Sequence, residues 1–221
     1  MTERPILMSA PMVTACMREV YQKTQTRRVL RPQPHEKLAD TVHYDRATGG
    51  AMWASIRGDH GVACPYGRPG DRLWVRETYA IIEVDGTHVS IARAERMPAG
   101  KTLADTDGGL KIIQVDRETA AWAAKRVDCE RWKPAIFMPR WACRLVLEVT
   151  AVRVERLQDI SEIDARAEGF LELPFLTDDP AVHRDAARDW YMDLWDSLNA
   201  ARGFDWKMNP WVWAVSFRRA A

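Results

Sequence analysis

The sequence lacks the features that mark membrane, secreted and metal-stabilised proteins. Its 221 residues contain no apolar run long enough to cross a bilayer and no leader of the secretory type. The four cysteines have neither a C-x-x-C pair nor tight spacing, which argues against a disulfide framework or a zinc site. A zinc site built from Cys64, Cys129, Cys143 and His60 is the less favoured alternative. We therefore expect a cytoplasmic protein with reduced thiols that needs no metal and no cofactor.

The chain also has almost no net charge. Its 32 lysines and arginines oppose 31 acidic residues, so no field of the whole molecule draws it onto a long polyanion. A nucleic-acid contact would therefore come from a local patch, unless the ligand is a single nucleoside or nucleotide. Tryptophan is abundant instead, at 10 residues, and this side chain serves both in cores and on surfaces that stack bases.

The N-terminal pattern predicts a short strand followed by a helix. Residues 5–9 form the predicted strand, and Ser9 or Ala10 caps a helix with Pro11 in its first turn, where a missing N–H costs nothing. Four residues fall at the helical spacing of one buried face: Val13, Cys16, Met17 and Val20.

Residues 23–28 (Lys-Thr-Gln-Thr-Arg-Arg) are the densest group of functional side chains, with an amine, two hydroxyls, a carboxamide and two guanidinium groups. Their strand-like alternation puts Thr24, Thr26 and Arg28 on one face. Gln25 and Arg27 fall on the other face, and we expect Arg27 to point outward. We interpret residues 23–28 as the lip of a pocket.

Two long stretches are predicted to be insertions in a single domain of residues 1–221. Residues 35–68 are rich in Gly, His and Asp and predict little regular structure. Residues 80–130 predict a hairpin over 81–91, followed by a polar segment. Between them, residues 72–79 alternate as a strand, in which Trp74 and Arg76 lie on a face unusually rich in functional groups.

The C-terminal half predicts further strands and two helices. Residues 142–157 predict two strands, or one strand bent around 150–151. Residues 159–169 predict a short capped helix that ends before Gly169, and residues 211–218 predict a closing strand. A longer amphipathic helix precedes that strand, with its apolar face marked by Val182, Ala186, Trp190, Leu194 and Leu198. Together these elements predict an α+β domain built on a small β-barrel.

Basic and aromatic residues interleave just before the strand region 142–157. This segment includes Trp132, Lys133, Arg140 and Trp141. Such residues can stack on and neutralise a nucleotide strand, although a core tryptophan pair with surface cations is slightly favoured.

Several of these segments, taken in order, resemble the ASCH domain family, which has a PUA-like β-barrel fold. They are residues 23–28 after a short helix, 69–75 opening a strand, 149–157, 159–169 and the closing strand 211–217. They span both ends of the chain, and the two predicted insertions lie outside them. The longer form, with residues 64–67 and 138–141, is similar to ASCH proteins carried by bacteriophages and prophages.

One branch of this family is similar to small bacterial amidohydrolases that remove the acyl group from N4-acetylcytidine. The resemblance implies that Lys23, Thr26 and Glu168 are catalytic and that Arg28 binds the substrate. Four more residues are candidates for lining the substrate pocket on their own chemistry or position: Thr24, Trp74, Arg76 and Trp141.

Amide hydrolysis needs a nucleophile, a base to activate it and a proton for the leaving amine. On this reading a partly desolvated Lys23 activates the hydroxyl of Thr26. Glu168 protonates the leaving amine or holds Lys23 in place. Arg28 binds an oxyanion, a base carbonyl or a phosphate.

Two other functions stay open. The chain could be a non-catalytic module that binds RNA or modified DNA through residues 131–141. A ribonuclease is less favoured, because no two-metal carboxylate cluster stands out in the sequence. In each case the expected partner is a nucleoside or a single-stranded nucleic acid and not a membrane, in the host cytoplasm if the chain is phage-encoded.

Overall fold

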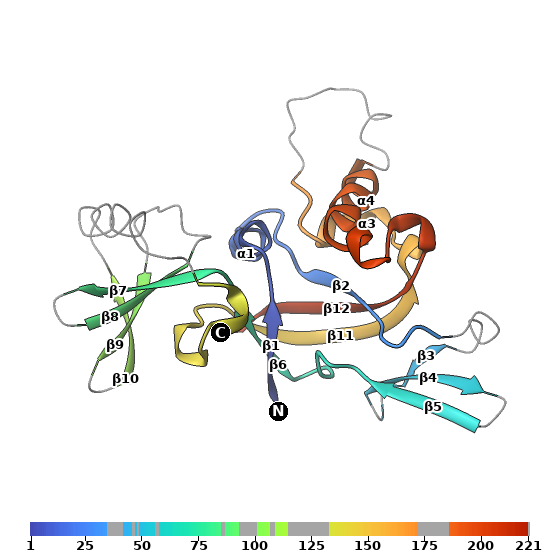
Figure 1. Cartoon of the computed structure of the whole chain (residues 1–221), viewed down its shortest axis with the longest axis horizontal. Helices are drawn as coiled ribbons and strands as arrows, with labels where there is room; N and C mark the ends of the chain where they lie inside the picture. The colour runs from blue at the N-terminus through green and yellow to red at the C-terminus, as the bar shows by residue number, and fades with distance from the viewer. Residues whose placement is uncertain are drawn as a thin grey trace. The chain divides into compact units, whose positions relative to one another are not determined.

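The computed structural model describes residues 1–34, 42–45, 47, 49–55, 58–84, 87–92, 101–106, 109–114, 133–171 and 186–220. The chain divides into two compact units. The first consists of Met1–Arg4, Ala15–Arg72 and Glu148–Ala221, and the second of Pro5–Thr14 and Leu73–Leu147. The fold is α+β, as the sequence predicts, with strands more numerous than helices among the described residues (Figure 1).

The elements follow one another in chain order. They are β1 (Glu3–Leu7), α1 (Ala10–Met17), β2 (Gln25–Val29), β3 (His43–Asp45), β4 (Gly50–Ser55), β5 (Gly58–Ala63), β6 (Arg72–Arg76), β7 (Tyr79–Val84), β8 (Thr87–Ala92), β9 (Lys101–Thr106), β10 (Gly109–Gln114), β11 (Val146–Arg156), α3 (Glu162–Ala167), α4 (Ala186–Asn199) and β12 (Trp211–Arg219). Short 3-10 helices cover Ala135–Phe137 (η2), Arg140–Ala142 (η3), Leu157–Asp159 (η4), Ala200–Arg202 (η5) and Trp206–Met208 (η6).

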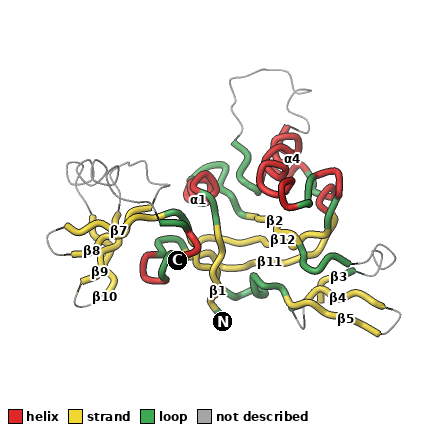
Figure 2. The backbone as a smooth tube through the Cα atoms, viewed as in Figure 1, coloured by secondary structure: helices red, strands yellow, loops and turns green. Residues whose placement is uncertain are grey.

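The strands form three sheets, drawn in yellow in Figure 2. Their strand orders are β1-β6-β11-β12-β2, β10-β9-β8-β7 and β3-β4-β5. Within the described strands, β1 and β2 are the two ends of the five-stranded sheet, so no pairing of the two closes it into a barrel. In the first unit β2 runs antiparallel to β12, with Thr26 opposite Val215 and Arg28 opposite Trp213.

The predicted helix after β1 is shorter than its apolar spacing suggests. Val13 and Cys16 are buried, but α1 ends at Met17, which is 39% exposed, and Val20 beyond it is 65% exposed. The backbone of Tyr21 has a positive φ of 53°, so the chain has left helical geometry before Lys23. The prediction was therefore wrong for Met17 and Val20.

The predicted insertions contain more strand than their composition suggests. Strands β3, β4 and β5 form an antiparallel sheet in a region where little regular structure was predicted. Beyond the predicted hairpin, formed by β7 and β8, the polar segment supplies β9 and β10. Strand propensity is weak and depends on context, so pairing with neighbouring strands overrides an unfavourable local composition.

The structure also tests two predictions for the C-terminal half, those for residues 142–157 and for the long helix. Residues 146–156 form the single strand β11, one of the two alternatives for that region. Helix α4 is amphipathic, but its buried residues are Ala187, Tyr191 and Trp195, one position later than the predicted face; Val182 lies outside the described residues. These three side chains pack with Leu157, Ile160, Ala165 and Val212 in the core of the first unit.

Candidate functional site

Lys23 and Glu168 meet in the first unit, although 145 positions separate them in the sequence. The Lys23 amine donates to the Glu168 carboxylate oxygen Oε2 at 2.6 Å and to the Glu168 backbone oxygen at 2.7 Å. Both side chains are buried, at 1% and 3% exposure. The contact is therefore a desolvated ion pair, in which each partner offsets the burial of the other's charge.

The local structure brings these residues together because a short helix ends beside Lys23. Ser161 caps the start of helix α3, with its hydroxyl accepting from the Asp164 N–H at 3.1 Å, and Glu168 caps the end of the helix. Gly169 follows with a φ of +106°, and a Cβ there would lie 3.3 Å from the Lys23 Cβ. Glycine therefore permits both the left-handed turn and the close approach. The Thr24 N–H fixes the approach by donating to Ala167 O at 2.9 Å.

Arg27 is the second cation on Glu168, and here the prediction that Arg27 points outward was wrong. Its side chain is fully buried. Its Nη1 donates to Glu168 Oε1 at 3.1 Å and to Gln25 Oε1 at 2.6 Å, and its Nε donates to Glu155 Oε1 at 2.7 Å. The guanidinium also lies 5.9 Å from the centre of the Tyr191 ring. The face of β2 that carries Gln25 and Arg27 is thus buried, with side chains of α3, α4 and β11 against it.

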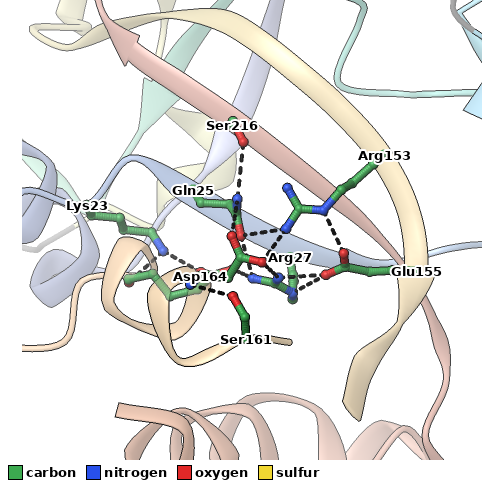
Figure 3. Close-up of polar contacts among 9 residues, drawn as sticks. Lys23, Gln25, Arg27, Arg153, Glu155, Ser161, Asp164 and Ser216 are labelled. Carbon is green, nitrogen blue, oxygen red and sulfur yellow. Dashed lines mark hydrogen bonds and ion pairs between the residues drawn. The ribbon is translucent and has the colours of Figure 1, made fainter. Parts of the chain in front are cut away.

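Arg153, Glu155 and Asp164 extend these contacts outward (Figure 3), and the Arg153 and Asp164 side chains are partly exposed. Arg153 contacts Glu155 and Asp164, each at 2.6 Å, and Asp164 lies 3.3 Å from Arg27. Gln25 donates to Asp164 at 3.2 Å and to Ser216 at 3.1 Å. We call the six charged residues the Glu168 network: Lys23, Arg27, Arg153, Glu155, Asp164 and Glu168. With three cations and three carboxylates, the Glu168 network is electrically balanced.

The surroundings shift the pKa values of several groups here. Burial acts to lower the pKa of Arg27, but the carboxylates of Glu168 and Glu155 outweigh it and raise that pKa. Burial acts to raise the pKa of Asp164, but Arg153 and Arg27 outweigh it and lower that pKa. Burial also raises the pKa of Cys16 to about 11, although Lys23 acts to lower it. Cys16 is therefore a protonated core thiol and not a nucleophile at neutral pH.

Thr26 and the other residues on its side of β2 are placed differently. Because side chains alternate along a strand, Thr26 points to the opposite face from Gln25 and Arg27. The Lys23 amine directs its hydrogen bonds to Glu168 and not to Thr26. Arg28 is half-buried opposite Trp213. The structure brings Lys23 and Glu168 together and leaves the Thr26 hydroxyl outside this contact.

The remaining candidates for substrate binding belong to the second unit. Trp74 is buried, with the guanidinium of Arg76 4.6 Å and that of Arg140 5.9 Å from the centre of its ring. Trp141 packs against the core cluster of Tyr79, Met138 and Ala142. Trp132, Cys129 and the side chain of His60 lie outside what the structure describes.

Sequence reasoning missed the Glu168 network beyond its Lys23–Glu168 contact. Arg153, Glu155 and Asp164 were not among the predicted site residues. A usable signal was present, because opposite charges at positions i and i+2 of β11 share one strand face. That face complements Gln25 and Arg27, which also stand two positions apart.

Within the described residues, no group of three or more His, Cys, Asp and Glu side chains is arranged to hold a metal ion. The carboxylates of the Glu168 network face arginine and lysine side chains instead. Among the helices of the described chain, none combines the length and the apolar character needed to span a membrane.

Comparison of the chain with protein-family models, with curated proteins and with solved structures found no match.

Proposed function

We propose that this chain recognises a nucleobase and hydrolyses the N4-acyl amide of acetylated cytidine, with Lys23 and Glu168 as its proton-carrying pair. The observation that carries the proposal is the 2.6 Å contact between the Lys23 amine and the Glu168 carboxylate. The resemblance to the ASCH family requires these two residues to meet across the chain. The same proposal includes the finer fold assignment, a PUA-like domain of phage or prophage type.

The chemistry assigns a role to each group. A hydroxyl oxygen adds to the acetyl carbonyl, the C–N bond to the exocyclic amine breaks, and water then releases acetate. The Lys23–Glu168 pair takes the proton from the attacking hydroxyl and gives it to the leaving amine. Arg28 holds the oxyanion or the base carbonyl. Because Lys23 and Glu168 are buried, the substrate reaches them through a local opening of the surrounding side chains.

Thr26 is the proposed nucleophile, and it lies on the face of β2 opposite to Gln25 and Arg27. The proposal therefore needs Thr26 to turn toward Lys23 when the substrate binds. If Thr26→Val retains full activity, a water molecule activated by the Lys23–Glu168 pair supplies the nucleophile instead.

In the direct test, the purified protein is incubated with N4-acetylcytidine and chromatography measures the cytidine released. Lys23→Met and Glu168→Gln preserve side-chain size, and each should lower the rate about 100-fold or more, the usual contribution of a general acid or base. Arg218→Lys, on an exposed ion pair with Glu148, is the matched control and should keep the wild-type rate. The hydrolase proposal fails if the wild-type protein releases no cytidine.

A second candidate is a non-catalytic module that binds single-stranded RNA or modified DNA. The observation that favours it is the pair of guanidinium groups, from Arg76 and Arg140, over the Trp74 ring. Labelled strands would be titrated at two salt concentrations, because phosphate contacts weaken steeply with salt. Arg140→Ala should weaken binding and reduce its salt dependence, and binding that does not change with salt contradicts this function.

A ribonuclease is the weakest candidate, since the described carboxylates of the Glu168 network are paired with cations.

A further inference from the structure

Glu168 divides its two carboxylate oxygens between two buried cations. Oε2 accepts from Lys23 at 2.6 Å, whereas Oε1 accepts from Arg27 at 3.1 Å. A carboxylate held at one oxygen can rotate about its terminal bond, but one held at both oxygens has a fixed plane. The direction in which Glu168 faces the Lys23 amine therefore depends on Arg27.

Arg27 is in turn held from several sides. Glu155 on β11 and Gln25 on β2 accept from its Nε and Nη1, and the ring of Tyr191 on α4 packs against its guanidinium. A guanidinium presents five N–H donors in a rigid plane, so it can satisfy these acceptors and Glu168 together. A lysine ammonium at the same position is a single point charge and cannot reach all of them.

The charge balance of the Glu168 network depends on Arg27 as well. Without it, the carboxylates of Glu155, Asp164 and Glu168 would face only the cations of Lys23 and Arg153. Lys23 would then be drawn toward a carboxylate group whose orientation is no longer fixed. A substitution that keeps the positive charge separates this electrostatic effect from the loss of the planar fork.

We propose that Arg27 is a positioning residue that fixes the Glu168 carboxylate against the Lys23 amine. Its consequence for catalysis rests on the proposed function, but its consequence for Lys23 is measurable without any substrate. A purely structural Arg27 would stabilise the first unit and leave the Lys23–Glu168 contact unchanged when lysine replaces it.

In the substrate-free test, the folded protein reacts with acetic anhydride, and mass spectrometry then measures the acetylation of each lysine. Lys23 should be protected in the wild type, and the exposed Lys133 and Lys207 serve as internal references. In Arg27→Lys, acetylation of Lys23 should rise about tenfold relative to both references, since a buried charge-assisted hydrogen bond is lost. Unchanged protection of Lys23 overturns the proposal.

A milder variant guards against a general loss of stability. Glu155→Gln removes one carboxylate partner of Arg27 at a partly exposed position and leaves Glu168 intact. Lys23 should again be acetylated faster than in the wild type, by less than in Arg27→Lys. If acetylation of Lys23 rises only in step with unfolding in both variants, the role is structural and the proposal is overturned.

The catalytic test uses N4-acetylcytidine. Arg27→Lys should lower kcat about tenfold with KM within about twofold, and Arg27→Gln should lower kcat further, because a misplaced proton carrier weakens the transition state more than substrate binding. If the wild type shows no turnover but Lys23 is acetylated faster in Arg27→Lys, the proposed function is refuted and this inference is retained. If the wild type is active and Arg27→Lys keeps both its kcat and its protection of Lys23, this inference is refuted and the proposed function is retained.

Discussion

Each unit of the molecule buries a glutamate against basic side chains, but the two arrangements differ in chemistry. In the second unit, Glu77 is 1% exposed and accepts from Arg144 Nε at 2.7 Å and Nη2 at 2.9 Å. The two parallel bonds of this fork engage both carboxylate oxygens with one partner. In the first unit, Glu168 accepts from Lys23 at one carboxylate oxygen and from Arg27 at the other.

The difference teaches which pair can move a proton. An arginine stays protonated in proteins, so the Glu77–Arg144 pair can hold structure but cannot exchange a proton. A lysine can lose its proton, and Arg27 would still hold Glu168 if the Lys23 contact opened. Between these two buried pairs, Lys23–Glu168 is therefore the one suited to acid–base chemistry.

The largest expected effect comes from breaking the Glu168 network at its centre. Arg27→Ala leaves three carboxylates facing two cations and should destabilise the protein by about 4 kcal/mol, as expected for removing one partner of a buried ion pair. Urea unfolding measures the loss. Arg218→Ala is the matched control on an exposed pair and should cost about 0.5 kcal/mol or less. Equal losses in the two variants would mean that burial of the Glu168 network adds nothing.

The Glu77–Arg144 pair should respond differently to a double substitution. Glu77→Leu alone leaves a largely buried guanidinium without this carboxylate and should cost about 3 kcal/mol. Adding Arg144→Met should recover most of that loss, because apolar groups of similar volume replace both charges. Thermal and urea unfolding of the two single variants and the double variant complete the cycle. Strictly additive losses would show that the two side chains do not form a functional pair in solution.

The pH dependence of stability should report the partly exposed residues of the Glu168 network. Asp164→Asn should cost about 2 kcal/mol at pH 7, because the charge-assisted hydrogen bond that Arg153 donates to the Asp164 carboxylate is weakened. The pKa of Asp164 is lowered in the folded state, so its contribution is fully present above the ordinary value of 3.8 and disappears as the pH falls through the lower folded value.

Urea unfolding at a series of pH values measures this difference between wild type and Asp164→Asn. The difference should stay constant from neutral pH down to about pH 5 and shrink with further acidification. A difference for Asp164→Asn that does not change in acid would contradict the role of Asp164 as an ionised partner of Arg153.

The sequence predicted the α+β class and the two faces of β2, but not that the Gln25–Arg27 face is covered as well as Thr26. Alternation groups Gln25 with Arg27 on one face, yet it cannot say that helices cover that face. The same limit explains α4, where apolar residues on adjacent positions make Trp190 and Tyr191 equally plausible core residues, and tertiary packing buries Tyr191.

The candidate site shows a similar division between local and long-range information. The meeting of Lys23 and Glu168 was inferred from the family resemblance, because no local pattern connects residues that far apart. The short helix after β11 was predictable from Ser161 and Gly169 at its two ends. The partners of Arg27 were not, because Glu155 and Asp164 look like ordinary surface residues until β11 and α3 are placed in space.

The smallest expected effect concerns the start of helix α3, which carries Glu168 at its other end. Ser161→Ala removes the oxygen that accepts from the Asp164 N–H, and loss of such a cap should cost about 1 kcal/mol. Ser197→Ala is the matched control, because the Ser197 hydroxyl donates to Leu194 O on the exposed side of α4 and caps no helix start. A weakened cap lets α3 fray more often, so Ser161→Ala should also speed acetylation of Lys23 slightly while leaving the Glu77–Arg144 pair unaffected.

Hydrogen exchange measures both regions in one experiment, with faster exchange expected for the Glu168 amide and no change for the Glu77 amide. Equal acceleration at the two amides would mean that the cap stabilises the whole protein and not the helix that presents Glu168.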